Sequence, residues 1–462
     1  MIRRILVLAS SIGLLSIHLL YAQIKVYSLK EILQKTLAQY PSLTSKKLAV
    51  EQQAYRKELI RKEQLPEITV QAQQSYGTYQ SVPGSFFALP GIYNISGNNK
   101  NITGQPSVTS NLYSSALLQW NFLQFGKVRT KLNVADAAIQ LSTTALSEEE
   151  LRLQVSSARQ YFNVLQRVAL LSVAKGDVQR LADLLDLSKT QANAGLRPAA
   201  DTLLLKSSYL QSRGIVNDQQ GLLETAKLEL ATLIGEDGNS FGIDSQLYNR
   251  VDTAKGIFSM DSLENHPYLH YLKANINYAN ASLKSVQRQP YPSIGLLAAA
   301  GIRGSGINST EIVTDNLSAP WQNNTGSYLA GVGVTWNFSS LYQNKVKQEI
   351  AVRSIESAKA DYQYADLQLE VAYKTAISRW KQQKEKVIDA KEALESSRLA
   401  YELYGVRYES GLINLIELLQ LQKILQDAEV NNAKALGAYW DELINQSESS
   451  GNIFLLLSFI NP

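Results

Sequence analysis

Two carboxylates are the side chains whose positions most suggest a function. Asp201 lies six residues after Gly195, and Glu417 lies six residues after Gly411. If several copies of the chain surround a passage, carboxylates at one offset from two glycine turns would form an acidic ring, which favours cations and resists anions. The other interpretation is equally open, because a carboxylate in the first turn of a helix also offsets the helix dipole.

The two histidines of the chain beyond residue 22 suggest a metal site only weakly. His266 and His270 have the i, i+4 spacing with which two side chains on one helix can share a metal ion. Pro267 directly follows the first of them, so we expect two solvated residues at a helix start. The chain has no cysteine, which excludes disulfides, thiolate metal ligands and cysteine nucleophiles. We expect no metal, no cofactor and no enzyme activity.

Nucleotide and nucleic-acid binding also find little support. Gly126-Lys127 resembles the end of a phosphate-binding loop, but Asn121 stands where the first glycine of that motif belongs and Val128 where its hydroxyl residue belongs. The formal net charge is only +4 over 462 residues. Such a balance gives no reason to expect a nucleic-acid partner.

The first 22 residues predict an export signal. Arg3 and Arg4 precede a mostly apolar stretch at 5–20, and Ala22 offers a small residue at the cleavage point. An N-terminal membrane anchor is the less favoured alternative, because the apolar stretch is short and interrupted by polar residues.

The remaining chain contains an internal duplication. Trp120-Asn-Phe122 is repeated as Trp336-Asn-Phe338, and 75 residues separate each tryptophan from Gly195 or Gly411. We therefore expect a two-fold sequence repeat. Its parts are a first repeat at 23–234, an irregular equatorial segment at 235–262, a second repeat at 263–445 and a C-terminal tail at 446–462.

Each repeat predicts two strands that flank a long polar loop. Alternation of apolar residues places the strands at about 67–80 and 112–122 in the first repeat, and at about 292–304 and 328–338 in the second. A strand of about 11 residues, tilted by about 45°, spans about 25 Å, the height of the apolar band of an outer-membrane barrel. Four strands cannot close around a water channel, so a duct would need several copies of the chain.

Aromatic residues close the second strand of each repeat. They are Trp120, Phe122, Trp336 and Phe338. At these positions they would form an interfacial girdle at the end of a membrane barrel. Ordinary packing in a core is the alternative interpretation.

Long helices follow these aromatics. Apolar residues step by four and three along one face at Leu151, Val155, Ala158, Phe162, Leu165 and Ala169, and by three and four at Ile355, Ala358, Tyr362, Ala365, Leu369, Ala372 and Ala376. This spacing is typical of a coiled-coil seam. The segment 127–193 has no proline, and as one helix it would be about 100 Å long. Gly195 and Gly411 would then end the two longest helices.

The duplicated motifs together resemble the TolC family of outer-membrane factors. The motifs are Trp120-Asn-Phe-x-x-Phe-Gly-Lys127, Gln191-Ala-Asn-Ala-Gly-Leu196 and Tyr408-Glu-Ser-Gly-Leu412. The resemblance implies a mainly α fold with a transmembrane β part. In it, a homotrimer contributes four strands per chain to a single 12-stranded β-barrel, which a periplasmic α-helical barrel continues. It also implies the outer membrane of a Gram-negative bacterium as the location.

The same resemblance implies a function and partners. The chain would be the passive outer-membrane channel of a tripartite efflux pump or a type I secretion system. It would contact outer-membrane lipid, a periplasmic adaptor (membrane fusion) protein and an inner-membrane pump of RND or ABC type. The adaptor would dock on the tips Ala194, Gly195, Leu196, Ser410, Gly411 and Leu412. A periplasmic coiled-coil structural or adaptor protein without a channel is the alternative, but it leaves the four strands unexplained.

The resemblance further implies a gate at these tips. Tyr408 matches a tyrosine that holds the entrance shut in the family, which suggests a bond to Asp201, and Glu417 would belong to the acidic ring. Two positions depart from the family pattern. Ile413 stands where an arginine is often found, and Gln420 replaces a second acidic residue. We therefore expect a lock that is weaker or differently connected.

Overall fold

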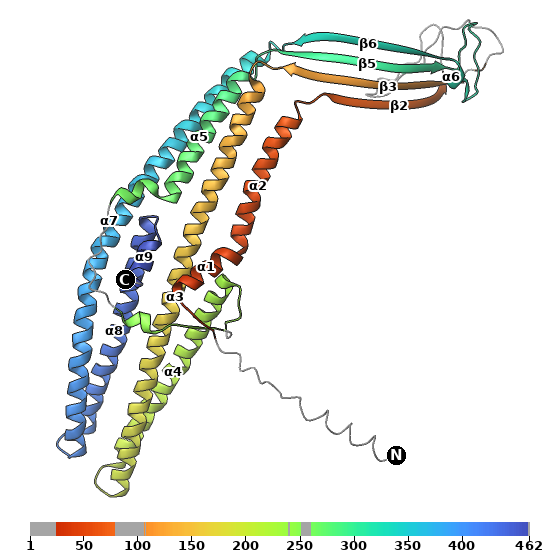
Figure 1. Cartoon of the computed structure of the whole chain (residues 1–462). Helices are drawn as coiled ribbons and strands as arrows, with labels where there is room; N and C mark the ends of the chain where they lie inside the picture. Colours follow the sequence, from red (N-terminus) through yellow and green to blue (C-terminus); the bar gives the residue numbers. More distant parts are fainter. Residues whose placement is uncertain (1–24, 79–105, 107, 239–240, 251–259, 461–462) are drawn as a thin grey trace, which may run out of the picture. The chain divides into compact units, whose positions relative to one another are not determined.

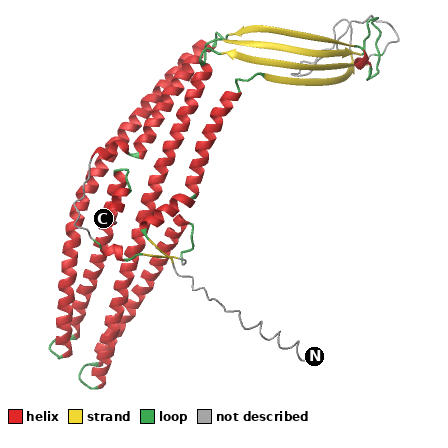
Figure 2. Ribbon diagram, viewed as in Figure 1, coloured by secondary structure: helices red, strands yellow, loops and turns green. Residues whose placement is uncertain are grey.

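A computed structural model describes residues 25–78, 106, 108–238, 241–250 and 260–460 of the chain. It divides into two compact units, which we treat separately. The sheet unit comprises Leu48–Thr143 and Tyr271–Tyr362, and the helical unit comprises Met1–Lys47, Thr144–His270 and Gln363–Pro462. The expected signal at 1–22 and most of the first polar loop lie outside the described residues. Helix dominates the rest, and nearly all strand residues belong to one sheet (Figure 2).

Four antiparallel strands form the centre of the sheet unit, in the order β2-β3-β5-β6 (Figure 1). They are β2 (Glu67–Thr78), β3 (Val108–Leu123), β5 (Ser293–Ser305) and β6 (Asn324–Thr335). The last strand lies earlier than the expected 328–338, so Trp336 and Phe338 follow its end. Its early start has a local cause, because the short helix α6 (Ala319–Gln322) returns the chain to β5, where Asn323 Nδ2 donates to the Ser305 carbonyl at 2.8 Å.

Small residues let β5 fit closely between its neighbours. Ala298 and Ala300 of β5 pair with Leu118 and Ala116 of β3. At Gly301 a Cβ atom would lie 2.9 Å from the Ser114 carbonyl oxygen, so a larger residue would push the two strands apart. Gly301 is therefore the position of β5 where the absence of a side chain is required by the close approach of β3.

The duplicated tryptophans make the same hydrogen bond in both repeats. Trp120 Nε1 donates to the Gln64 carbonyl at 2.8 Å, and Trp336 Nε1 donates to the Pro290 carbonyl at 2.9 Å. Each bond joins the end of a repeat's second strand to the segment just before its first strand. Trp120, Phe122, Trp336 and Phe338 are between 38% and 61% exposed, so packing in the core of this chain does not explain them.

Four helices belong in part to both units: α2 (Pro41–Lys62), α3 (Lys127–Asn193), α5 (Pro267–Arg288) and α7 (Ser340–Glu409). The helical unit also contains α1 (Leu29–Gln39), α4 (Ala199–Ile234), α8 (Leu415–Ser449), α9 (Phe454–Ile460) and the 3-10 helices η1 (Gln246–Asn249) and η2 (Met260–Asn265). Its strands β1 (Lys25–Tyr27) and β4 (Phe241–Ile243) pair in parallel.

The expected irregular segment and tail are partly regular. The segment 235–262 contains β4, η1 and the start of η2, while 446–462 contains the end of α8 and all of α9. Among the described residues, no helix combines the length and the apolar character that a membrane crossing requires.

Large aromatic residues anchor the core of the helical unit. The rings of Phe162 and Trp440 stack with centroids 4.6 Å apart. Trp440 Nε1 donates to the Tyr248 carbonyl at 3.1 Å, and Tyr248 Oη donates to the Ala433 carbonyl at 2.6 Å. These bonds satisfy the indole nitrogen of Trp440 and the hydroxyl of Tyr248, because a polar atom buried away from water needs a hydrogen-bond partner.

The seam predicted on α3 is largely confirmed, and the one on α7 is confirmed in part. Five of the six predicted α3 positions, from Leu151 to Leu165, are buried. On α7 the predicted positions Ile355, Ala358, Ala365 and Ala376 are buried, whereas Ala372 is exposed and its neighbour Tyr373 is buried instead. A straight helix has 3.6 residues per turn, so a 3.5-residue pattern drifts around it, which accounts for the displacement by one residue at Ala372.

The core predicts the effect of removing one stacked ring. Phe162→Ala deletes a buried aromatic side chain and leaves a cavity beside Trp440, so we expect the free energy of unfolding to fall by about 3–5 kcal/mol. Chemical denaturation followed by tryptophan fluorescence measures the loss. Phe454→Ala is the matched control, because Phe454 is 71% exposed. Equal losses in the two variants would contradict the assigned core.

Candidate functional site

Two helix turns with the same geometry form one end of the helical unit. Gly195 follows α3 with φ +72°, and Gly411 follows α7 with φ +75°, a region that favours glycine. The next residue closes both turns in the same way, since Leu196 N donates to the Gln191 carbonyl and Leu412 N to the Arg407 carbonyl, each at 2.9 Å. The leucines at the two tips are 74% and 69% exposed.

The two carboxylates lie in the first turns of the returning helices. Asp201 is the third residue of α4, and Glu417 is the third residue of α8. Asn414 caps α8, since its Oδ1 accepts from Glu417 N at 2.9 Å and its Nδ2 donates to Glu417 Oε1 at 2.6 Å. Glu417 thus has a local role at the helix start, while its exposed carboxylate is still accessible to ions.

Arg197 joins the two turns, and the sequence analysis did not identify it. Its Nη2 donates to the Tyr408 carbonyl at 3.1 Å and to the Ile413 carbonyl at 3.4 Å. Its guanidinium also lies 4.7 Å from the centre of the Tyr408 ring, within cation–π range. The sequence did contain a signal. The arginine absent two residues after Gly411 is present two residues after Gly195.

Tyr408 does not make the expected bond to Asp201. Its ring is fully buried in a cluster that includes Leu181, Leu205 and Leu418, and its hydroxyl has no hydrogen-bond partner within the described chain. Burial raises the pKa of Tyr408, the positive charge of Arg197 opposes this rise, and the negative charge of Asp201 adds to it. Arg197 therefore supplies the polar contact between the turns, and the apolar cluster around Tyr408 supplies the packing. Leaving a buried hydroxyl unpaired costs about 1–3 kcal/mol.

A buried polar network links the same helices further along. Asp177 of α3 is 2% exposed and accepts hydrogen bonds from Ser212 of α4 and from Gln422 and Gln426 of α8. Next to it, Arg180 of α3 forms an ion pair with Glu429 of α8, with Nη2 and Oε2 2.7 Å apart. Sequence spacing gave no sign of this network, because its members are far apart in the chain.

Backbone hydrogen bonds occupy both ring nitrogens of His266, the first histidine of the pair. His266 is buried, which corrects the expectation that it is solvated. Its Nδ1 accepts from Tyr268 N at 3.1 Å, so its Nε2 carries the proton and donates to the Glu448 carbonyl at 3.0 Å. Burial lowers the pKa of His266 and keeps it neutral. Within the described residues, no cluster of His, Asp or Glu is arranged to hold a metal ion.

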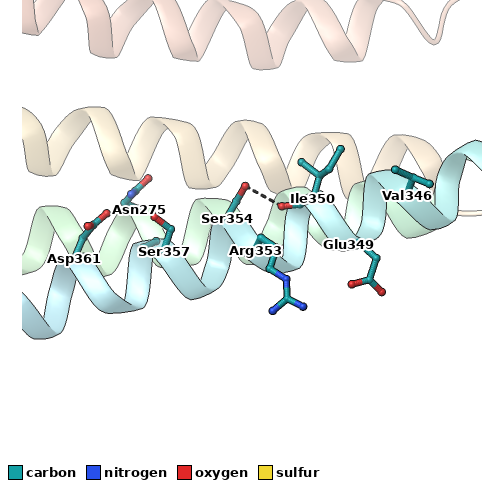
Figure 3. A pocket seen from close by; sticks show the side chains of 9 residues that line it. Asn275, Val346, Glu349, Ile350, Arg353, Ser354, Ser357 and Asp361 are labelled. Atoms are coloured by element: carbon teal, nitrogen blue, oxygen red, sulfur yellow. Dashed lines mark hydrogen bonds between the residues drawn. The ribbon is translucent and has the colours of Figure 1, made fainter.

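An open groove of about 610 Å³ runs along α7 in the sheet unit (Figure 3). Asn275 of α5 lines it together with residues of the first part of α7, among them Val346, Glu349, Ile350 and Arg353. Val346 and Ile350 are each 62% exposed. Ser354 of the same lining donates its hydroxyl to the Ile350 carbonyl at 3.1 Å. The exposed apolar side chains of the groove suggest a contact surface.

Comparisons with solved structures show the fold. The chain matches the Campylobacter jejuni CmeC outer membrane channel with a TM-score of 0.71 and 16% identity, over 92% of this chain and 85% of that one. It matches the open state of the Neisseria gonorrhoeae MtrE outer membrane channel with a TM-score of 0.69 and 17% identity, over 92% and 89%. It matches the Vibrio cholerae outer membrane protein VceC with a TM-score of 0.68 and 13% identity, over 92% of this chain and 96% of that one.

The sequence itself also matches a protein family. The model of the outer membrane efflux protein family covers residues 32–236 and 259–451, which is most of the chain and includes both helix turns. No curated protein matches the chain. The chain belongs to the outer membrane efflux protein family, and it is an efflux channel of the outer membrane with a helical periplasmic extension.

Proposed function

We propose that three copies of this chain assemble into one duct, with a 12-stranded β-barrel in the outer membrane and an α-helical barrel in the periplasm. The observation that carries the proposal is the pair of free edges of the four-stranded sheet. β2 and β6 each have one neighbouring strand in the described chain. In lipid, an open strand edge leaves backbone groups unsatisfied, so these edges need partners from other copies.

The surface of the sheet supports a lipid contact. Every residue of β6 is exposed in the single chain, including Val332 and Val334, each at 67%. On β2, Ile68 is 65% and Val70 is 72% exposed. Such side chains are costly to leave in water and suit the outward apolar band of a membrane barrel. The exposed aromatics Trp120, Phe122, Trp336 and Phe338 would then form the interfacial girdle.

The exposed tips supply the docking surface for partners. Ala194, Gly195 and Leu196 form one tip, and Ser410, Gly411 and Leu412 form the other. An exposed leucine beside a glycine turn offers an apolar side chain that a partner protein can bury. We assign these tips to a periplasmic adaptor that connects the duct to an inner-membrane pump of RND or ABC type. The energy for export then comes from the pump.

The same turns act as the entrance of the duct. Arg197 fastens the turn after α7 to the turn after α3, and Asp201 and Glu417 place carboxylates beside this contact. Threefold repetition of these residues gives a mouth that attracts cations. MtrE has been solved in an open state, so at least one channel of this fold adopts such a state. In our proposal, opening requires Arg197 to release its two carbonyl acceptors.

Substitution of Arg197 tests whether its contacts hold the entrance closed. Arg197→Ala deletes two charge-assisted hydrogen bonds and a cation–π contact, of which a single charged hydrogen bond contributes about 1.5–3 kcal/mol. We expect the open probability of single channels in planar bilayers to rise about tenfold or more. Arg197→Lys keeps the positive charge but lacks the planar guanidinium group. Its open probability should lie between those of the parent protein and Arg197→Ala.

Arg213→Ala is the matched control for that measurement. Arg213 is an exposed arginine of α4 whose guanidinium carbon lies 5.8 Å from the centre of the Tyr209 ring on the same helix. Its loss should leave the open probability unchanged. If Arg197→Ala also gates like the parent protein, Arg197 does not hold the entrance closed.

Removing a carboxylate tests the acidic ring. Glu417→Ala takes one negative charge per copy from the mouth, so we expect a higher single-channel conductance or the loss of block by divalent cations in planar bilayers. Asp201→Ala should act in the same direction. Asp186→Ala removes an exposed carboxylate that is paired with Lys189 and should change neither property. Unaltered conductance and block in both entrance variants would refute the ring.

A further inference from the structure

A second groove, on the helical unit, carries a charge pattern that the duct and its tips do not explain. It has a volume of about 460 Å³ and lies between α7 and α8, with Asn249 of η1 at its border. Lys384, Lys391 and Arg398 of α7 line it. We call it the basic groove.

The cations of the basic groove repeat at the period of a coiled coil. Lys384, Lys391 and Arg398 are seven residues apart, which places them on one face of α7 at intervals of about 10.5 Å. None of the three forms an ion pair with another described residue, and Glu395 is the one carboxylate in the lining. Three cations against one carboxylate leave the lining with a net charge of +2, arranged along the helix axis.

An apolar strip lies beside these cations. Val387 and Leu436 form its buried floor, at 4% and 6% exposure, while Ile388 of the same lining is 49% exposed. Apolar residues flanked by charges at seven-residue spacing are the arrangement with which one helix recognises another. A carboxylate-bearing helix would bury Ile388 and neutralise the three cations in a single contact.

The pattern belongs to the second repeat alone. Gly195 and Gly411 are 216 positions apart, and at this offset the residues of the first repeat are Val168, Lys175 and Ala182. Only one of the three cations is therefore duplicated. A trimer would offer three such grooves and not six, so the basic groove distinguishes the two otherwise similar helical hairpins of each copy.

We propose that the basic groove binds an amphipathic helix of a periplasmic partner protein, with apolar residues facing Ile388 and carboxylates at seven-residue intervals facing Lys384, Lys391 and Arg398. The inference rests on the proposed duct, because a partner must reach the helical extension from the periplasm. The positive charge of the groove favours a helix that carries carboxylates. Because only the second repeat has the three cations, each chain would bind one such helix.

A designed helix probes the groove directly. The probe is a labelled four-heptad peptide with leucine at two positions of each heptad and glutamate at one flanking position, and its counterpart carries lysine in place of glutamate. We measure binding to the full-length protein in detergent by fluorescence anisotropy at increasing salt. The glutamate probe should bind about tenfold more tightly than the lysine probe, and salt should reduce the difference.

Charge-matched variants locate the binding. Lys391→Glu with Arg398→Glu should weaken binding of the glutamate probe about tenfold. The control changes Lys381→Glu with Lys386→Glu, two exposed lysines of α7 outside the groove, and should bind like the parent protein. A photo-crosslinker at Ile388 should capture the glutamate probe, and one at Leu403, which is 68% exposed elsewhere on α7, should not.

Three outcomes would overturn the proposal. They are equal binding of the two probes, equal loss in the two charge variants, or a changed oligomeric state of the Lys391→Glu/Arg398→Glu variant in light scattering, which would assign the groove to a second copy. Single-channel recordings separate this failure from failure of the duct. The groove variant should conduct like the parent protein, whereas absence of channels in both would reject the proposed duct itself.

Discussion

Backbone hydrogen bonding at the two edges of the sheet is the constraint on which the proposed assembly depends. Among the described strands, β3 and β5 are paired on both sides, whereas β2 and β6 are paired on one. Water can satisfy such an edge, but lipid cannot. In the proposed assembly further copies therefore continue the sheet at both edges, and the number of strands per chain sets how many copies complete the duct.

The helical unit meets a different requirement, which is to keep two similar hairpins in register. The stacked pair Phe162 and Trp440 fixes α3 against α8 in the core. The Asp177 network repeats this link with polar groups, and Arg197 repeats it at the turns. Apolar packing thus holds the hairpins at two levels, around Phe162 and Trp440 and again in the cluster of Tyr408, Leu205 and Leu418 next to the turns. The Asp177 network lies between these levels, and Arg197 adds a charged contact at the turns. Charged contacts at the surface respond to salt and to charged partners, which suits the proposed entrance.

Several features were predictable because they depend on local physics. The glycine turns at Gly195 and Gly411, the unbroken helix between Lys127 and Asn193, and most of the α3 seam follow from backbone preference and apolar spacing. Family motifs also gave the outer-membrane efflux assignment. The strand boundaries were less accurate, because the position of β6 depends on how α6 returns the chain to β5.

The sequence alone determined where the chain turns, which face of α3 is apolar and which family the chain belongs to. These properties depend on residues that are close together in the sequence. Only the tertiary structure decided which side chains meet between the hairpins. It assigned the polar contact at the turns to Arg197, and among the described residues it gave the hydroxyl of Tyr408 no hydrogen-bond partner. It also buried His266 against the Glu448 carbonyl. The reason is that such contacts join residues about 180 or more positions apart, and their pairing depends on how the helices pack.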